Sequence, residues 1–372
     1  MDLSQLAEGL FEVPSGFNPG ITGMTADSRT LRDGDAFIAV SGQTAHGLSY
    51  LKPEQADRAA VVLFEPPAPA AYQPSARAVP VPALKPLQAR IAARYFGSPS
   101  EAMTVIGVTG TNGKTSTVQL LAGAFTGLGK RAGTIGTLGI GLFGKIQSGE
   151  RTTPDVIAVH RALAEMHEDG AQVVAMEVSS HALEQGRVAE VVFDTAVFTN
   201  LTLDHLDYHG SMQAYFDAKA KLFAYPGLRQ AVINVDDAYG RALLDRLPDA
   251  LPLLRVSANG NPDADLRVED IRLGLDGMRF TLVHGGQRCE VASSLLGRFN
   301  VDNLLAVAGV LVSLGHGLAE IGEVLGGLLP VDGRMSRLGG IGRQPVVVVD
   351  YAHTPDALEQ AVKTLRGHGQ AR

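Results

Sequence analysis

A glycine-rich loop between an apolar strand and a helix constrains the fold of this chain more than any other feature. The loop Gly110–Thr115 reads Gly-Thr-Asn-Gly-Lys-Thr and directly follows the apolar run Val105–Thr109. A helical pattern over Ser116–Gly127 comes next. Glycines let backbone amides approach phosphate oxygens, and a helix N-terminus adds partial positive charge. The arrangement therefore predicts a nucleotide phosphate site in an α/β domain, in preference to a purely structural turn.

The side chains of this loop have separate expected roles. Lys114 is expected to neutralise the β- and γ-phosphates, and the Thr115 hydroxyl to bind Mg²⁺. The strict motif requires glycine where this chain has Val108, so the generic pattern is missed at one position. The expected ATP contacts are Gly110, Thr111, Asn112, Gly113, Lys114, Thr115 and Ser116.

Polar residues also follow two further apolar strands. Glu177 follows the expected strand Gln172–Met176, and a polar segment that includes His205 follows the expected strand Asp194–Phe198. Ligands in open α/β sheets bind beyond the carboxyl ends of strands, so these side chains should share one edge with the loop. Glu177 and His205 are thus candidate ligands, with Thr115, of a metal that bridges nucleotide and substrate. Taken singly, each is more often an ordinary loop or cap residue.

Lys219 lies on the apolar face of a predicted helix that begins after the N-cap candidate Ser211. Lys221 lies off that face, which carries Met212, Tyr215, Phe216, Leu222 and Phe223. An inward lysine is costly unless it is paired or chemically altered, and burial beside another cation depresses its pKa. The neutral amine could capture carbon dioxide as a carbamate that binds metal. A lysine that extends its ammonium group to solvent is the alternative.

Two hydroxyls precede another expected helix. Thr152 and Thr153 come before Pro154, which is expected at the first helical position. Hydroxyls and exposed amides there would form an anion site, whereas a simple N-cap would need only Thr153.

Two asparagines begin the apolar helix that runs to Leu314. Asn300 and Asn303 are both candidate caps. Asn303 is also a candidate to present its amide to a nucleotide base.

Changes in the pattern of apolar strands, helices and Pro-rich turns divide the chain into three expected domains. Residues 1–97 mix short strands with Pro-rich turns and end in the helical pattern Leu84–Phe96. Residues 98–333 alternate apolar strands with helices, which is typical of a mostly parallel α/β sheet. Residues 334–372 form the third unit.

The third unit is small. It offers one strand, Pro345–Val349, and one helix from Pro355, with Thr354 as the expected cap. One strand and one helix cannot close a core, so we expect the chain to stop inside this domain.

Composition excludes several classes of protein. The formal net charge of −7 argues against bulk attraction to nucleic acid or acidic membrane. The single cysteine, Cys289, excludes an internal disulfide and any multi-cysteine metal site. The first residues lack a signal peptide, and the longest apolar run, Leu304–Gly315, is shorter than the roughly 18 residues that span a bilayer. We expect a cytoplasmic protein without membrane insertion; no feature indicates an oligomeric state.

In several of the motifs described above, the chain resembles the Mur ligases, the ATP-dependent amide-forming enzymes of peptidoglycan precursor synthesis. Within the family it is similar to the MurE type, which adds the third residue to UDP-N-acetylmuramoyl-L-alanyl-D-glutamate. The matching motifs run in order along essentially the whole chain: Asp27–Arg29, Gly110–Thr115, Glu150–Pro154, Met176–Leu183, Phe198–Leu201, Asp204–Gly210, Ala218–Lys219, Gly297–Asn300 and Asp350–Pro355.

The resemblance implies an N-terminal UDP-binding domain (1–97), a central P-loop ATPase domain (98–333) and the beginning of a Rossmann-like, amino-acid-binding domain (334–372). It implies that Lys219 is carbamylated and acts in catalysis together with Lys114 and His205. Magnesium contacts are implied for Thr115, Glu177 and His205. Contacts to adenine, phosphate and ribose are implied for Asn303, Arg334 and Asp350.

The resemblance also implies a site for the UDP-muramoyl-peptide. The stretch Gln43–Ala45 departs from the Gln-containing motif commoner in the family, His-Gln-Ala. The implied residues are Ser28, Gln43, Thr44, Ala45, Thr152, Thr153, Ser179, Gln185 and Arg187.

The implied reaction activates a carboxylate, with ATP as co-substrate and Mg²⁺ as cofactor. The D-glutamyl γ-carboxylate becomes an acyl phosphate, and the amine of the incoming amino acid then displaces phosphate. Meso-2,6-diaminopimelate is the expected amino acid and lysine the alternative, because the family's selecting motif, Asp-Asn-Pro-Arg, is not in this chain.

Several other functions are compatible with parts of this sequence. A MurF-type ligase is the nearest rival, and folylpolyglutamate synthetase shares the ATPase core. From other classes, a P-loop kinase or GTPase would use the same loop, but the guanine-reading motif Asn/Thr-Lys-x-Asp is not in the sequence. A nucleotide-binding fragment without turnover is the remaining alternative.

Overall fold

The computed structural model describes residues 1–372 except residues 43, 150, 275, 340–345, 353–354 and 369–372. The chain forms two compact units. Unit 1 comprises Met1–Ala102, Pro154–His167 and Gln185–Val191, and unit 2 comprises Met103–Thr153, Glu168–Glu184 and Val192–Arg372. This division differs from the expected domains, because two later segments pack with the N-terminal residues and the last residues group with unit 2.

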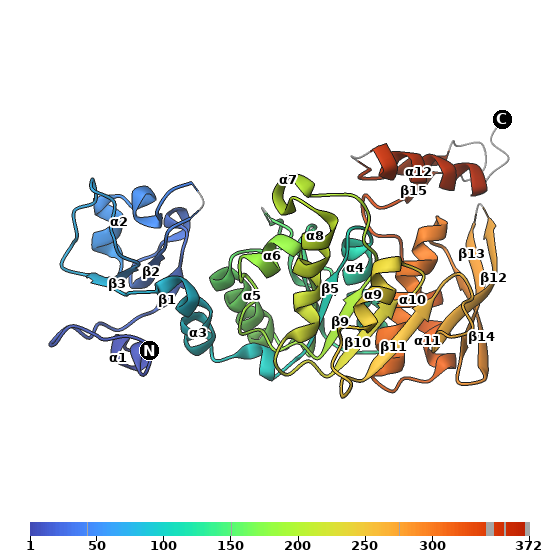
Figure 1. Cartoon of the computed structure of the whole chain (residues 1–372), viewed down its shortest axis with the longest axis horizontal. Helices are drawn as coiled ribbons and strands as arrows, with labels where there is room; N and C mark the ends of the chain where they lie inside the picture. Colours follow the sequence, from blue (N-terminus) through green and yellow to red (C-terminus); the bar gives the residue numbers. More distant parts are fainter. Residues whose placement is uncertain (43, 150, 275, 340–345, 353–354, 369–372) are drawn as a thin grey trace. The chain divides into compact units, whose positions relative to one another are not determined.

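Unit 1 is built on four parallel strands in the order β1-β2-β3-β4 (Figure 1). The strands β2 and β3 are buried at every position, which is typical of a parallel sheet covered on both faces. The strands are β1 (Gly23–Thr25), β2 (Asp35–Ala39), β3 (Val61–Phe64) and β4 (Ala78–Pro80). The α-helices are α1 (Leu3–Ala7), α2 (Pro53–Arg58), α3 (Leu84–Phe96) and α5 (Val156–Glu168).

Unit 2 contains a ten-stranded sheet in the order β14-β13-β12-β11-β10-β9-β5-β8-β6-β7. Neighbours from β6 to β12 pair in parallel, whereas β7, β13 and β14 add antiparallel edges. The mostly parallel α/β architecture predicted from the sequence is therefore confirmed. The strands are β5 (Thr104–Thr109), β6 (Ala132–Gly136), β7 (Gly139–Leu142), β8 (Val173–Glu177), β9 (Thr195–Phe198), β10 (Gln230–Asn234), β11 (Leu253–Ser257), β12 (Leu266–Gly274), β13 (Gly277–His284) and β14 (Gln287–Ser293).

The helices of unit 2 pack on this sheet. Helix α4 packs against β6, β8 and α10, and α10 packs against β10 and β11. Most side chains of α10 are buried. This is expected of a helix that is apolar around most of its circumference. The α-helices are α4 (Lys114–Gly127), α6 (Ser180–Glu184), α7 (Leu206–His209), α8 (Met212–Ala220), α9 (Ala238–Leu244), α10 (Arg298–Ser313), α11 (Leu318–Gly326) and α12 (Pro355–His368).

The neighbouring strands β8, β5 and β9 place three polar segments on one sheet edge. All three strands run in parallel, so the segments that follow them leave from the same side. These segments begin at Val178, Gly110 and Thr199. The common edge predicted for the loop and the two polar segments is therefore confirmed.

Two predicted helix starts are wrong. Helix α5 begins after Asp155, whose carboxylate accepts two backbone hydrogen bonds at 3.0 Å and so caps the helix in place of Thr153. Asn300 and Asn303 are not caps, because α10 already begins at Arg298. They lie buried inside its first two turns and bond to each other at 2.8 Å.

The last described elements are a two-stranded antiparallel ribbon and one helix. The ribbon pairs β15 (Ser336–Gly339) with β16 (Val346–Val349), and α12 begins at the expected Pro355. Thr354, the expected cap, lies outside the described residues. Among the described residues, no helix combines the length and the apolar character needed to cross a membrane.

Candidate active site

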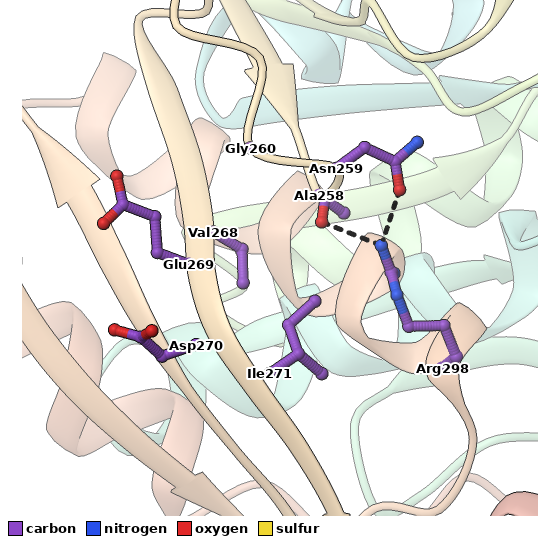
Figure 2. A pocket seen from close by; sticks show the side chains of 8 residues that line it. All are labelled: Ala258, Asn259, Gly260, Val268, Glu269, Asp270, Ile271 and Arg298. Atoms are coloured by element: carbon purple, nitrogen blue, oxygen red, sulfur yellow. Dashed lines mark hydrogen bonds between the residues drawn. The ribbon is translucent and has the colours of Figure 1, made fainter.

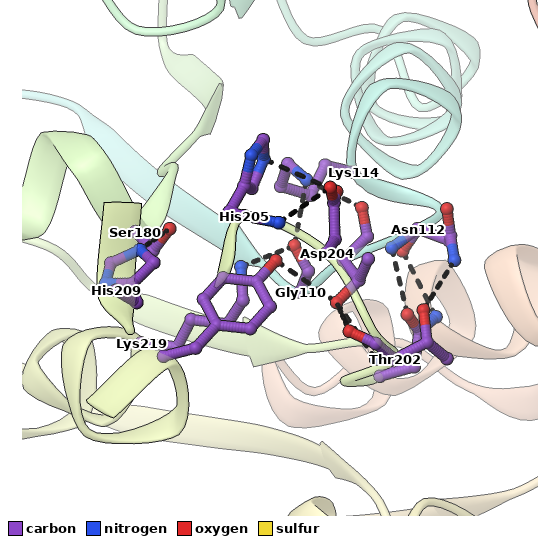
Figure 3. A network of polar contacts seen from close by, with 12 residues as sticks. Gly110, Asn112, Lys114, Ser180, Thr202, Asp204, His205, His209 and Lys219 are labelled. Carbon is purple, nitrogen blue, oxygen red and sulfur yellow. Dashed lines mark hydrogen bonds and ion pairs between the residues drawn. The ribbon is translucent and has the colours of Figure 1, made fainter. Parts of the chain in front are cut away.

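The loop Gly110–Thr115 is held by the segment that follows β9 (Figure 3). Asn200 accepts hydrogen bonds from Asn112 N through its side chain at 2.9 Å and from Thr111 N through its carbonyl at 2.8 Å. Thr199 Oγ1 donates to the Asn112 carbonyl at 2.7 Å. These bonds fix the loop without a ligand, so its amides need little rearrangement to bind a phosphate.

Two glycines of the loop are required by its geometry. Gly110 has a φ of +149°, and a Cβ there would lie 1.9 Å from Thr199 Oγ1. Gly113 has a φ of +85°, and a Cβ there would lie 2.6 Å from Asn303 Oδ1. The predicted base contact, Asn303, therefore lies directly against the phosphate loop.

Lys114 begins helix α4 and folds back over the loop. Its Nζ donates to the carbonyls of Gly110 at 2.8 Å and Thr111 at 2.9 Å. Burial lowers the pKa of Lys114, whereas the carboxylates of Glu177 and Asp204 raise it. The net shift is downward, and the two acidic groups oppose it beside the loop where Lys114 is expected to act.

Glu177 ends β8 with its carboxylate buried, at 1% exposure. Its Oε2 accepts from the Thr115 hydroxyl at 3.0 Å, and its Oε1 accepts from the backbone of Thr137 at 2.7 Å. Burial raises the pKa of Glu177, while Lys114 and these hydrogen bonds lower it. Two of the three predicted metal ligands are thus in contact.

His205, the third predicted ligand, makes other contacts. Its Nε2 lies 3.4 Å from Asp204 Oδ2, and its ring centre lies 4.9 Å from that of His181. Burial lowers the pKa of His205, Asp204 raises it, and Lys114 and Lys219 lower it further. In the part of the chain that the structure describes, no three His, Cys, Asp or Glu side chains form a metal-binding group.

The donors that do meet fit magnesium. Thr115 and Glu177 offer oxygen atoms, which Mg²⁺ prefers. Magnesium bound by one or two protein oxygens takes its other ligands from water and substrate phosphates. The pair therefore suits a cation that arrives with a nucleotide on the loop.

Lys219 points into the protein, as its helical phase predicts (Figure 3). It is 1% exposed, and its Nζ lies 2.7 Å from the Gly110 carbonyl and 4.5 Å from the centre of the Tyr215 ring. Lys221 lies on the outside, where it pairs with Glu184. The predicted contrast between the two lysines is confirmed.

Lys114 and Lys219 donate to the same carbonyl oxygen, at 2.8 and 2.7 Å, so their amines lie no more than about 5.5 Å apart. Two ammonium ions at that distance repel by about 3 kcal/mol at an effective dielectric constant of 20. Burial and the charge of Lys114 hold the pKa of Lys219 well below its usual range. Asp204 opposes this shift at Lys219, whereas both Glu177 and Asp204 oppose the lowering of the pKa of Lys114.

Two residues from the end of the chain complete the surroundings of the loop. Arg334 Nη2 lies 3.3 Å from Thr115 Oγ1. Asp350 accepts a hydrogen bond from the backbone of Met335 at 2.8 Å, so it holds the residue next to Arg334. The structure thus brings Asn303 and Arg334 to the loop, and it ties Asp350 to Arg334 through the backbone of Met335.

The residues implied for the UDP-muramoyl-peptide divide between the two units. Ser28, Thr44, Ala45, Gln185 and Arg187 belong to unit 1. Within it, Ser28 accepts a hydrogen bond from Gln55, and Arg187 donates to Gln185. Gln43 lies outside the described residues.

The other three residues of this set belong to unit 2. Thr153 Oγ1 donates to the Glu177 carbonyl at 2.8 Å and lies 3.4 Å from Ser179 Oγ. Thr152 Oγ1 lies 3.0 Å from the hydroxyl of Thr137. These hydroxyls therefore line the segment beside the Glu177 carboxylate.

A surface hollow lies elsewhere in unit 2 (Figure 2). None of the predicted site residues lines it. Arg298 crosses it to the carbonyl of Ala258 at 2.8 Å and pairs with Asp302 at 3.1 Å, so its charge is already engaged. The hollow does not compete with the loop as a phosphate site. Its lining is Ala258, Asn259, Gly260, Val268, Glu269, Asp270, Ile271 and Arg298.

Sequence reasoning missed several residues that shape the site. Thr137 holds the Glu177 carboxylate, and Asn200 holds the loop backbone. Tyr215 covers Lys219 and contacts the Thr111 hydroxyl at 3.2 Å. Asn200 lies two residues after the predicted strand Asp194–Phe198, and this place could have indicated a contact with the loop. Thr137 gave no such signal, because it follows a strand that was not predicted.

We expect Gly110→Ala to disrupt the loop. The new methyl group would overlap the Thr199 hydroxyl, at a cost of about 1–3 kcal/mol in stability, and nucleotide binding should fall with it. Gly127→Ala is the control, because a Cβ there meets no atom within 4 Å. Gly127 is the last residue of α4, the helix that follows the loop. Thermal unfolding and titration with ADP measure both effects; equal behaviour of the two variants would contradict the assigned loop geometry.

Comparisons with known proteins show which proteins this chain resembles. Residues 108–311 match the family model described as the Mur ligase middle domain. The whole chain is 55% identical over 372 residues to the UDP-N-acetylmuramoyl-L-alanyl-D-glutamate--2,6-diaminopimelate ligase of Xanthomonas campestris pv. campestris (strain 8004), of which it covers 74%. The protein of that name from Pseudomonas aeruginosa is 49% identical over 352 residues, which are 94% of this chain and 71% of that protein.

Solved structures of Mur ligases also match this chain over most of its length. A structure of a UDP-N-acetylmuramoyl-L-alanyl-D-glutamate--2,6-diaminopimelate ligase matches with a TM-score of 0.77 at 33% identity, over 94% of this chain and 70% of that one. A MurF ligase from Thermotoga maritima in complex with ADP matches with a TM-score of 0.68 over 93% of this chain and 74% of that one. At 19% identity, this second likeness shows the fold alone.

Proposed function

The chain belongs to the Mur ligase family, and we propose that it joins 2,6-diaminopimelate to UDP-N-acetylmuramoyl-L-alanyl-D-glutamate with ATP as the driving co-substrate. The observation that carries this proposal is the 55% identity across all 372 residues to a ligase named for that reaction. The same name recurs among relatives at 49–53% identity, which favours diaminopimelate over lysine. Structures of MurF ligases match at 18–19% identity, which shows the fold alone.

The proposed reaction has two steps. A γ-carboxylate oxygen of the D-glutamyl residue attacks the γ-phosphorus of ATP, the bond to the bridging oxygen breaks, and ADP leaves. The amine of diaminopimelate then attacks the acyl carbon, loses a proton and expels inorganic phosphate. Such reactions depend mainly on positioning and on neutralising phosphoryl charge, so Lys114 and Arg334 are the proposed charge partners.

The loop and its neighbours are the proposed ATP site. Backbone amides of the loop and the N-terminus of α4 would bind the phosphates, and Asn303 would face the base. Asp350 is the proposed ribose contact. Thr115 and Glu177 would hold Mg²⁺, with His205 as the proposed further ligand, and the bound cation would neutralise phosphate charge.

Lys219 is the proposed site of carbamylation. Its neutral amine would attack the carbon of CO₂, form an N–C bond, turn one C=O bond into C–O⁻ and release a proton to solvent. The product is an anion beside Lys114, so an attraction replaces the repulsion that two ammonium groups would have there. The low pKa and the buried position of Lys219 support this proposal.

Residues 1–97 are the proposed UDP-binding domain and residues 98–333 the proposed ATPase domain, and residues 334–372 are proposed to belong to the amino-acid-binding domain. Ser28, Thr44 and Ala45 are proposed to contact the UDP end. The muramoyl-peptide is proposed to contact Thr152, Thr153, Ser179, Gln185 and Arg187. Because ATP and UDP-linked precursors are cytoplasmic metabolites, we place the reaction in the cytoplasm.

Calorimetry with three precursors tests the function. We expect UDP-N-acetylmuramoyl-L-alanyl-D-glutamate to bind at least tenfold more tightly than the precursor that lacks the D-glutamyl residue. The precursor that already carries the third residue should also bind more weakly, whereas a MurF-type ligase would prefer it. ADP release in the presence of diaminopimelate, compared with lysine, then identifies the added amino acid. Preference for either of the other two precursors would contradict the proposal.

A further inference from the structure

We propose that the hydroxyl of Thr137 is a positioning group that couples the muramoyl-peptide site to the Glu177 carboxylate. Thr137 lies in the turn between β6 and β7. Its hydroxyl lies 3.3 Å from Glu177 Oε2 and 3.0 Å from Thr152 Oγ1. The inference rests on the proposed function, which makes Thr152 a contact of the acceptor substrate and Glu177 a magnesium ligand.

The number of hydroxyl hydrogens determines which group donates in the contacts of Thr137 with Thr152 and Glu177. A threonine hydroxyl carries one hydrogen, whereas an ionised carboxylate can only accept. The stronger bond forms to the charged acceptor, so Thr137 donates to Glu177 and Thr152 donates to Thr137. The three side chains therefore form one ordered chain of hydrogen bonds that runs from Thr152 to Glu177.

Binding at Thr152 would reverse part of this chain. If an oxygen of the muramoyl-peptide takes the Thr152 hydrogen, Thr152 can only accept from Thr137. The Thr137 hydrogen then leaves Glu177 Oε2, the same oxygen that accepts from Thr115. One donor that competes with a cation is thereby removed, and the acceptor substrate prepares the carboxylate for the magnesium that comes with ATP.

The surroundings keep this coupling local. Glu177 is 1% exposed, and a Cβ on Gly136 would lie 2.4 Å from its Oε1, so the end of β6 is pressed against the carboxylate. The backbone of Thr137 also binds Oε1 at 2.7 Å, and this bond does not depend on the side chain. The carboxylate therefore stays in place when the hydroxyl turns away.

The test measures the MgCl₂ concentration that gives half-maximal binding of a non-hydrolysable ATP analogue, with and without UDP-N-acetylmuramoyl-L-alanyl-D-glutamate. The precursor should lower that concentration about five-fold, the effect of one typical hydrogen bond. In Thr137→Val, the concentration should be the same with and without the precursor, because the hydroxyl is gone while the backbone bond to Glu177 remains. Thr137→Ser should restore the shift.

Thr126→Val is the matched control, because it removes a hydroxyl that bonds only within helix α4. If the valine variant does not fold, Thr137→Ala carries the same expectation. A folded Thr137 variant without a hydroxyl that keeps the full shift overturns the inference, and so does a wild type that binds both ligands without any shift. A wild type that binds neither the precursor nor the analogue instead contradicts the proposed function itself.

Discussion

Lys114→Ala is expected to weaken binding of ATP and ADP at least 30-fold while the protein stays folded. The Lys114 amine donates hydrogen bonds to two carbonyls of the loop. Without this amine, bound β- and γ-phosphates would lose their nearest cation. Loss of one partner from a desolvated charge pair typically costs about 2–5 kcal/mol. The loop itself should persist, because Asn200 and Thr199 hold its backbone without help from the lysine. Calorimetric titration with ADP measures the loss, and thermal unfolding checks the fold.

Lys130→Ala is the control for this experiment. It removes the same charge from an exposed position just beyond the helix that Lys114 begins. The control should bind ADP like the wild type. Unchanged ADP affinity in Lys114→Ala, or an equal loss in both variants, would contradict the assignment of the loop as the phosphate site.

Much of the site could be predicted because parallel strands carry a strong signal. The apolar runs before Gly110, Glu177 and Thr199 are buried on both faces, and their register places the following residues on one edge. The inward position of Lys219 followed from helical phase alone. These predictions depend on local pattern, which a single sequence displays directly.

The residues that position the ligands could not be predicted in this way. Thr137 reaches Glu177 only because β6 pairs with β8. The strand Ala132–Gly136 contains two glycines among five residues, so its pattern is weak, and no local feature gives its pairing partner. A hydrogen bond between segments 40 residues apart depends on sheet order, which is a property of the whole domain.

The return of a later segment to the N-terminal unit could not be predicted for a related reason. The helix α5 follows the central strands in sequence, yet Val156 and Ile157 join the hydrophobic core of unit 1. Within that unit, His160 bonds to the carbonyl of Ala189, which ties the two late segments together. A change of composition marks where a linker lies, but it does not show a later segment that returns to an earlier core.

Removal of carbon dioxide and bicarbonate is expected to abolish most of the magnesium-dependent turnover of ATP, and their return should restore it. The reason is the buried amine of Lys219, whose pKa lies well below its usual range and which would carry a carbamate only while CO₂ is present. Only the neutral amine reacts, and acid reverses the reaction, so the modified fraction should rise with pH. Carbon-13 NMR with labelled bicarbonate should reveal a carbamate carbon, and its signal should decline as the pH is lowered.

Two lysine variants decide whether Lys219 is the modified residue. Lys219→Ala should lose the carbamate signal and the turnover at every bicarbonate concentration, because it has no amine to modify. Lys221→Ala, two residues along on the outer side, should keep both, since its amine only pairs with Glu184 at the surface. An unmodified lysine that merely bonds to the Gly110 carbonyl predicts no dependence on bicarbonate. A bicarbonate-independent wild type together with an active Lys219→Ala would refute carbamylation.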